Sequence, residues 1–296
     1  MALRQPQSAL SPTGSADSIL LTPVQEKLRM TQPLAGKIVI ITGASSGVGE
    51  AAARAFSRAG ATVVLAARSA QKIAELAKAL GGLAVPTDIS RVGDLKALVE
   101  KTLATCGRID VLVNNAATNA RGAFDSIEAE AIAAIIDTNL KAPMLLTRFA
   151  LPHLRQSRGV VVNVASIAGH VPLPGEAPYC ASKWGLRGFT FAVREELRDA
   201  GVAVCVVSPG PIATPFVLDD LDHVPDLVFS QPISTAEEVA DAIVACAIDR
   251  RRERALPRST LMLAKLAAAF PWLQVVLRPS LEAKGAKVKA KLRRRG

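Results

Sequence analysis

The sequence predicts an α/β fold, in which a doubly wound parallel sheet carries helices on both faces within a single domain. Half of the 296 residues are hydrophobic, whereas aromatic residues make up only 4%. This composition suits helices packed on a parallel sheet better than an antiparallel sandwich. From Lys37 onward, short β-rich runs alternate with amphipathic segments of helical length, as in repeated βαβ units with right-handed crossovers.

The individual elements follow from these alternating runs. The expected strands are apolar runs at 38–41, 62–65, 83–85, 111–113, 160–164 and 202–207, with a weaker seventh near Ala255. Helices are expected to begin near Gly47, Ala70, Val92, Glu128, Pro178 and Thr235. For the last helix, the N-cap is Ser234 or Thr235, with Glu237 or Glu238 in the first turn.

Charge is distributed unevenly along the chain. Residues 251–296 hold 13 of the 36 Lys and Arg residues but 2 of the 26 Asp and Glu residues, so this end carries +11 and the rest −1. We therefore expect three parts: a flexible N-terminal arm at 1–35, a folded domain at 36–257, and an apolar helical segment with a basic tail at 258–296. The four cysteines are far apart and no metal-ligand spacing occurs, so we expect no disulfide, no metal site and a cytoplasmic location.

A glycine-rich turn follows the first strand directly. It contains Gly43, Ser45, Ser46, Gly47, Val48 and Gly49. Glycines let the backbone approach a pyrophosphate, whose charge is favoured by free N–H groups and the positive end of the following helix. The spacing Gly-x-x-x-Gly-x-Gly differs from the common dinucleotide fingerprint, but the strand before it and the helix after it supply the expected Rossmann-like context.

The end of the second strand bears on the choice of cofactor. An acidic side chain there would bind the 2′-hydroxyl of NAD, but the chain has Arg68 and no carboxylate. A guanidinium matches the charge and geometry of a 2′-phosphate, so NADP(H) is favoured over NAD(H). The alternative is that Arg68 merely starts a solvated helix.

A Tyr-x-x-x-Lys pair lies near the start of a later helix. Tyr179 and Lys183 are four residues apart and therefore share one helix face, where an ammonium could lower the pKa of the phenol. Ser166 follows the apolar strand 160–164 and could hydrogen-bond a substrate oxygen at the same sheet edge. Taken singly, these residues could be a solvated pair and a capping serine, but together, in this order, they indicate a proton-transfer site.

In these features the chain resembles the short-chain dehydrogenase/reductase family over about Leu34–Pro257. The matching residues are Thr42–Gly49, Asp88, Ile89, Asn114, Asn115, Ala116, Asn139, Ser166, Tyr179, Lys183, Pro209, Gly210, Pro211, Ile212, Ala213 and Thr214. The resemblance implies a dinucleotide-binding catalytic domain at 36–257 and a homo-oligomer. Two departures are Ala117, where the family usually has Gly, and a C-terminal end that lacks the usual Asp-Gly-Gly and so puts the common tetramer in doubt.

The resemblance also implies a role for each matching residue. Tyr179 would be the general acid/base, Lys183 would hold the nicotinamide ribose and lower the tyrosine pKa, and Ser166 would polarise the substrate carbonyl. Asn139 would hold a water that links Lys183 to solvent. Cofactor contacts are implied for Asp88 and Ile89 at the adenine, for Ile212 and Thr214 at the nicotinamide amide, and for Asn115, Ala116, Pro209 and Gly210.

Two apolar segments leave alternatives open. The loop 209–232 is either a mobile lid over a hydrophobic substrate or an ordinary packed excursion. The segment 261–277 either packs on the enzyme, closing the pocket or a dimer interface beside a disordered basic end, or lies on an anionic membrane surface. Nucleic-acid binding is not expected, because the tail lacks a reader module and interleaved aromatics.

These features predict an NADP(H)-dependent oxidoreductase that moves a hydride between the nicotinamide and a carbonyl or alcohol of a hydrophobic substrate. An alternative of another class is a catalytically idle dinucleotide sensor or scaffold that binds partners through its tail. Retention of Ser166, Tyr179, Lys183 and Asn139 together argues against the alternative, because a sensor needs no proton relay.

Overall fold

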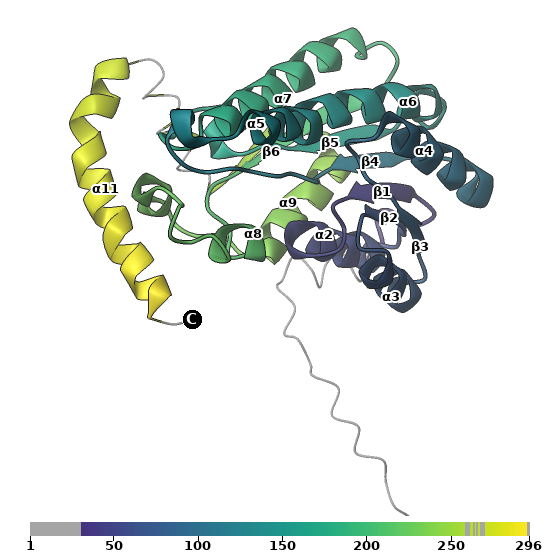
Figure 1. The fold of residues 1–296 in the computed structure, drawn as a ribbon. Helices are drawn as coiled ribbons and strands as arrows, with labels where there is room; N and C mark the ends of the chain where they lie inside the picture. Colours follow the sequence, from purple (N-terminus) through teal and green to yellow (C-terminus); the bar gives the residue numbers. More distant parts are fainter. Residues whose placement is uncertain (1–30, 258–260, 263, 265, 267–269, 295–296) are drawn as a thin grey trace, which may run out of the picture.

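The predicted parallel sheet is present, with seven strands in the order β3-β2-β1-β4-β5-β6-β7 (Figure 1). The computed structural model describes residues 31–257, 261, 262, 264, 266 and 270–294. The strands are β1 Ile38–Thr42, β2 Thr62–Ala67, β3 Leu83–Pro86, β4 Val111–Asn114, β5 Val160–Val164, β6 Ala203–Pro209 and β7 Glu253–Leu256. The order reverses between β1 and β4, which is where doubly wound sheets open a crevice.

Helices cover both faces of the sheet. The α-helices whose bounds lie within the described residues, including α11 outside the sheet layers, are α2 Gly47–Arg58, α3 Ala70–Leu80, α4 Val92–Cys106, α5 Ala129–Ile136, α6 Ala142–Ser157, α7 Ala177–Glu196, α8 Pro215–Leu218, α9 Ala236–Asp249 and α11 Pro271–Arg293. One apolar layer joins α2, α3 and α9 to side chains such as Val39 and Ile41. The other joins α4 and α6 to Ile38 and Ile40. Because successive strand residues point to opposite faces, nearly continuous apolar strands fill both layers.

The element starts expected from the sequence are close to the observed ones. The N-cap of α9 is Thr235, whose Oγ1 accepts from the Glu238 N–H at 3.2 Å while Glu238 Oε2 accepts from the Thr235 N–H at 2.9 Å. This reciprocal capping box is one of the two predicted alternatives. Between α5 and α6 the chain makes a π turn, Asp137–Lys141, that the sequence pattern did not distinguish from a continuous helix.

The two ends of the chain relate differently to the sheet. Residues 1–30 of the expected arm lie outside the described residues, whereas Leu34, at the end of that range, is buried in the core and its N–H donates to Ala59 O at 3.0 Å. At the other end, α11 runs outside the sheet layers and packs on the short helix η4, Asp226–Ser230 (Figure 1). The basic residues of α11, up to Arg293, are therefore helical, unlike the disordered basic end considered above.

Asp110, at the entrance to β4, is a buried carboxylate that ties the sheet together. Its oxygens accept from Lys37 Nζ at 3.1 Å, Arg108 at 2.6 and 2.8 Å, and the Ile38 N–H at 3.0 Å. Burial alone would raise the pKa of Asp110, but the hydrogen bonds from Arg108, Ile38 and Lys37 outweigh it, and the pKa lies below its usual range.

We expect Asp110→Asn to lower the free energy of unfolding by about 2 kcal/mol near neutral pH, because three donors lose a charged acceptor. The folded-state pKa of Asp110 is depressed, so its stabilisation is present above the unfolded-state pKa of about 4 and is lost as pH falls through the folded-state value. Denaturant titrations across that acidic range should show a shallower loss of stability for Asp110→Asn than for the wild type. Asp125→Asn, at an exposed position, is the matched control.

Candidate active site

The residues singled out from the sequence gather at the carboxyl ends of the strands. A cavity of about 840 Å³ opens there. It is lined by Gly43, Ser45, Ser46, Gly47, Val48, Gly49, Arg68, Asp88, Ile89, Asn115, Ala116, Ser166, Tyr179, Lys183, Pro209, Gly210, Ile212 and Thr214. Because all the strands are parallel, loops far apart in sequence meet at this edge. Of the candidate residues, only Asn139 lies behind the cavity wall.

The glycine turn is tightly built against the loop that follows β4. Gly43 has φ +67°, and a Cβ there would lie 2.8 Å from Ala116 Cα. At Gly49 a Cβ would lie 2.1 Å from Gly43 O. Asn115 Nδ2 braces the turn by donating to Thr42 O at 2.9 Å, and Thr42 Oγ1 accepts from the Asn115 N–H at 3.0 Å. The turn thus presents bare backbone to the cavity at the start of α2, where an anionic group is favoured.

The next part of the cavity wall comes from the ends of β2 and β3. Arg68 follows β2 and is exposed at the rim. Asp88 Oδ1 accepts from Ser90 Oγ at 2.7 Å and from the Ser90 N–H at 3.0 Å. These hydrogen bonds hold the pKa of Asp88 below its usual range, and the nearby charges of Arg68 and Arg91 lower it further. A cation and an ionised carboxylate therefore flank this end of the cavity.

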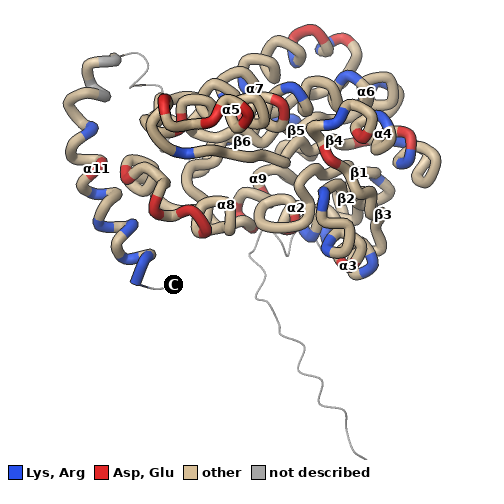
Figure 2. The backbone as a smooth tube through the Cα atoms, viewed as in Figure 1, with Lys and Arg blue, Asp and Glu red and all other residues tan. Residues whose placement is uncertain are grey.

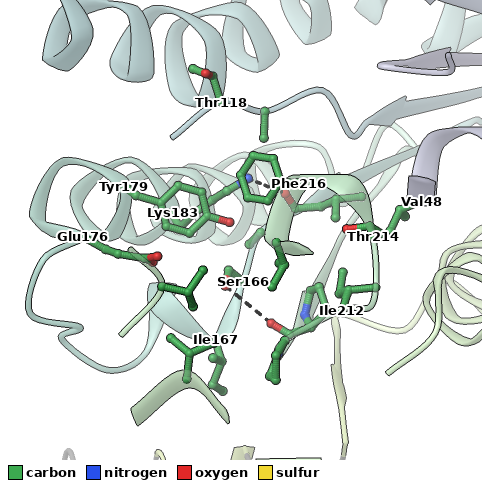
Figure 3. A pocket seen from close by; sticks show the side chains of 18 of the residues that line it. Val48, Thr118, Ser166, Ile167, Glu176, Tyr179, Lys183, Ile212, Thr214 and Phe216 are labelled. Atoms are coloured by element: carbon green, nitrogen blue, oxygen red, sulfur yellow. Dashed lines mark hydrogen bonds between the residues drawn. The ribbon is translucent and has the colours of Figure 1, made fainter. Parts of the chain in front are cut away.

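Tyr179 and Lys183 lie at the inner end of the cavity, on the first turns of α7 (Figure 3). Both side chains are buried, and Lys183 Nζ lies 5.5 Å from the Tyr179 ring centroid. The ammonium donates to Val164 O, at the end of β5, at 2.9 Å. Burial lowers the pKa of Lys183 to about 7 and raises the pKa of Tyr179 above its ordinary value. Desolvation therefore dominates both groups in the protein alone.

Ser166 lies beside this pair, just beyond β5. A hydrogen bond to Ser166 lowers the pKa of Tyr179 and so opposes part of the effect of burial. Ser166 Oγ accepts from the Ala168 N–H at 3.1 Å and is 3.5 Å from Pro209 O, to which it can donate (Figure 3). The serine thus caps a short helix, Ile167–Gly169, as one interpretation states, while its contact with a substrate oxygen stays a prediction.

Asn139 is fully buried in the π turn behind the cavity. Its Oδ1 accepts from the Thr118 N–H at 2.9 Å, while its Nδ2 donates to Thr118 O at 2.9 Å and to Ser182 Oγ at 3.1 Å. Both amide hydrogens are therefore used within the protein. The side chain joins the loop after β4 to α7 at the residue next to Lys183.

An ion-pair cluster around a buried arginine, which the sequence pattern did not reveal, closes the side of the cavity. Arg121 Nε donates to Glu176 at 2.8 Å, and its Nη1 donates to Asp220 at 2.7 Å. The guanidinium also lies 5.5 Å from the Phe216 ring centroid, and that ring is 6.2 Å from the Tyr179 ring. Burial opposes the charge of Arg121, but its hydrogen bonds to Asp220 and Glu176 leave its pKa raised.

Glu176 precedes α7, and burial raises its pKa in spite of Arg121. No motif marks this arginine, because its partners are 55 and 99 residues away in sequence. Only a contact between these distant segments could have identified it.

Side chains from two segments, most of them apolar, make the outer wall. The loop 209–232 contributes Phe216, Val217, Val224, Leu227 and Val228. The C-terminal segment contributes Ala264, Val275, Leu277, Arg278 and Leu281. The loop therefore lies over the cavity as the lid interpretation requires, and its mobility stays a prediction. The C-terminal segment packs on the enzyme at the cavity, as one of the two alternatives states.

Comparison with known proteins identifies the family. The sequence profile of short chain dehydrogenases matches residues 37–223. This chain belongs to the short-chain dehydrogenase family. The family and its relatives make it an oxidoreductase of the type that acts on alcohol and carbonyl groups. The catalytically idle alternative is not favoured by this membership.

Several family members are similar over most of this chain. The ketoacyl reductase HetN of Nostoc sp. (strain PCC 7120) is 40% identical over 71% of this chain and 75% of its own length. The 3-oxoacyl-[acyl-carrier-protein] reductase FabG of Thermotoga maritima is 36% identical over 73% of this chain and 92% of its own. The 11-beta-hydroxysteroid dehydrogenase A of Sesamum indicum is 34% identical over 75% of this chain and 68% of its own.

A solved structure of the family shares the fold. The 3-ketoacyl-(acyl-carrier-protein) reductase of Brucella melitensis, complexed with NADH, aligns with a TM-score of 0.70 at 29% identity. The alignment covers 99% of that chain and 76% of this one, so part of this chain has no counterpart there.

The crowded glycine turn yields a direct test. Gly49→Ala would place a methyl 2.1 Å from Gly43 O and 2.7 Å from Asn115 Nδ2, so the turn must open. We expect at least about a tenfold loss of nicotinamide dinucleotide affinity, because the N–H groups move off the pyrophosphate position. Fluorescence titration with NADPH measures it. Gly93→Ala, where an added Cβ meets nothing within 4 Å, is the matched control and should bind as the wild type does.

Proposed function

We propose that this oxidoreductase uses NADP(H) and that Tyr179 transfers the proton to or from the substrate oxygen. The observation that carries the proposal is the burial of Tyr179 and Lys183 side by side at the inner end of a cavity into which the glycine turn also opens. Burying a phenol and an ammonium away from water costs free energy. Groups in a cavity whose pKa values are shifted by burial are candidates for acid/base chemistry.

The residues present fit a nicotinamide dinucleotide. Gly43 and Gly49 allow the turn to pack closely on itself and on the loop after β4, which leaves its backbone along the cavity for a pyrophosphate, and Arg68 adds a cation at the rim for a 2′-phosphate. Asp88 and Ile89 would contact the adenine, and Lys183 the nicotinamide ribose. The remaining wall residues would surround the rest of the dinucleotide: Ser45, Ser46, Gly47, Val48, Asn115, Ala116, Pro209, Gly210, Ile212 and Thr214. When bound, the cofactor supplies or accepts the hydride.

In the reducing direction, the Tyr179 hydroxyl donates its proton to the carbonyl oxygen of the substrate as the C=O bond becomes C–OH. Its raised pKa keeps the phenol protonated before the reaction. Ser166 Oγ, which neighbours Tyr179, donates a hydrogen bond to the same substrate oxygen in place of Pro209 O. The Lys183 ammonium stabilises the phenolate that remains after transfer, because an opposite charge nearby favours the ionised form.

The neighbouring polar groups hold this arrangement in place. Asn139 holds the loop after β4 against α7, and both of its amide hydrogens are engaged. A water between Asn139 and Lys183 would therefore donate to a carbonyl oxygen of Asn139. The apolar wall formed by residues such as Phe216 and Leu227 favours a hydrophobic carbonyl or alcohol as substrate. The ketoacyl reductases among the relatives support carbonyl reduction as the direction to test first.

Replacing Tyr179 by Phe tests the proton path. We expect kcat/KM for carbonyl reduction to fall by roughly 10²–10⁴-fold, because the ring and its packing on Phe216 remain while the proton is lost. NADPH affinity should stay close to that of the wild type. Turnover within about threefold of the wild type would contradict the role of Tyr179. Phe229→Leu, a change at a buried aromatic away from the reacting atoms, controls for packing.

Replacing Arg68 by Ala tests the cofactor preference. The wild type should bind NADPH more tightly than NADH, and Arg68→Ala should weaken NADPH binding by about 10- to 100-fold while leaving NADH nearly unchanged, because a charge-assisted contact to the phosphate is lost. Titration calorimetry with both cofactors measures this. Arg91→Ala removes a nearby exposed guanidinium that does not line the cavity and should change neither affinity. Equal or tighter binding of NADH by the wild type would contradict the preference.

A further inference from the structure

The described C-terminal residues expose an unusual amount of apolar side chain. Met262, Trp272, Val275 and Val276 are 71%, 61%, 74% and 65% exposed, and Phe270 is 49% exposed. Single exposed apolar residues are ordinary, but a run of them within one short segment marks a surface that meets something other than water.

The exposed apolar side chains of α11 gather in its first half and its exposed lysines in its second half. Trp272, Val275 and Val276 are spaced by three and four residues and share one side of the helix, whereas Lys287 and Lys291 share a side turned by about a quarter of a turn from it. Lys284 lies beside them and is also exposed. We call these two adjoining exposed sides, the apolar first part and the cationic second part, the outer face of α11.

The opposite side of α11 is already occupied by the enzyme. Gly285 meets the lid so closely that a Cβ would lie 1.8 Å from Asp226 O. Lys289 is buried there and donates to Asp222 O at 3.0 Å and Val224 O at 2.7 Å. Arg293 adds an ion pair with Asp222 at 2.6 Å. These contacts, all in the second half of α11, turn Lys284, Lys287 and Lys291 away from the protein.

The lysines of the outer face have no counter-charges within the described part of the chain. Lys284, Lys287 and Lys291 are exposed, and the ion pairs of α11 with the lid use Lys289 and Arg293 instead. Figure 2 shows Lys and Arg along the second half of α11, next to a loop that carries acidic residues, with which Lys289 and Arg293 pair. A partner for this half of the face should therefore be anionic.

The apolar part of the face adjoins the opening of the cavity. Val275, Leu277, Arg278 and Leu281 of α11 line the cavity in which Tyr179 lies. A surface that covers Trp272 and Val276 would therefore lie beside the opening of the cavity. None of the described helices is long and apolar enough to cross a bilayer.

We propose that the outer face of α11 docks on the surface of an anionic lipid bilayer, with its apolar part in the acyl boundary and its lysines among the headgroup phosphates. A bilayer surface offers both phases side by side, which matches the two parts of the face. A second copy of this face would bring the same lysines and no carboxylates. Docking would place the cavity opening against lipid, so the substrate is a carbonyl or alcohol dissolved in the membrane; this last step rests on the proposed function.

Vesicle co-sedimentation of the full chain tests the docking. We expect binding to vesicles of phosphatidylcholine mixed with phosphatidylglycerol, weak binding to phosphatidylcholine alone, and release at high salt. The triple variant Lys284→Glu, Lys287→Glu and Lys291→Glu should lose at least about tenfold in affinity for the mixed vesicles. The variant Lys78→Glu, Lys101→Glu and Arg148→Glu changes charge equally at exposed sites on other helices and should bind as the wild type. Equal binding to both vesicle types, or equal losses in the two variants, would overturn the proposal.

Tryptophan fluorescence tests the apolar half independently. The chain has two tryptophans, so Trp184→Phe leaves Trp272 as the sole reporter. Its emission should move to shorter wavelength when mixed vesicles are added and should be quenched by brominated acyl chains. An unmoved emission, or the same shift on raising protein concentration without lipid, would overturn bilayer docking, the latter in favour of a second copy. Neither measurement uses turnover, so its outcome is separate from that of the Tyr179→Phe test.

Discussion

The burial of an ammonium beside a phenol, at the one edge where parallel strands end together, is the constraint on which the rest of this structure depends. Lys183 keeps its Nζ out of water by donating to Val164 O, and the cost of that burial appears as a pKa lowered to about 7. The same dry environment raises the pKa of Tyr179. Such a pair persists only if the surrounding backbone holds α7 firmly against β5.

Polar networks behind the cavity provide that firmness. Asn163, in β5, accepts from Asn114 Nδ2 and donates to Thr190 in α7, both at 2.8 Å, which links two central strands to the helix that carries Tyr179. Arg121 does the same from the other side, since its two carboxylate partners join the start of α7 to the loop 209–232. Polar contacts thus brace the segments around the cavity, and apolar side chains form part of its wall.

The sequence was sufficient for the sheet and most of the site because both depend on local patterns. Apolar runs set the strands, and the turn at Gly43 and Gly49 is recognisable because only glycine fits there. The Arg121 cluster, the partners of Asn139 and the packing of α11 on the lid could not be predicted, since each depends on contacts between segments far apart in the chain. The tail illustrates this: its composition left both packing and lipid contact open, and the described helix packs on residues 226–230 while lipid contact of its exposed side is a proposal.

The central claim is that Tyr179 and Lys183 act as one buried acid/base unit beside the bound cofactor. Because Tyr179 is the only tyrosine, the absorbance of tyrosinate during a pH titration reports its pKa alone. We expect that pKa to lie above the ordinary value of about 10 in the protein alone, to fall when NADP⁺ binds, and to fall less in Lys183→Met. A Tyr179 pKa near the ordinary value that responds to neither NADP⁺ nor the loss of Lys183 would contradict the account.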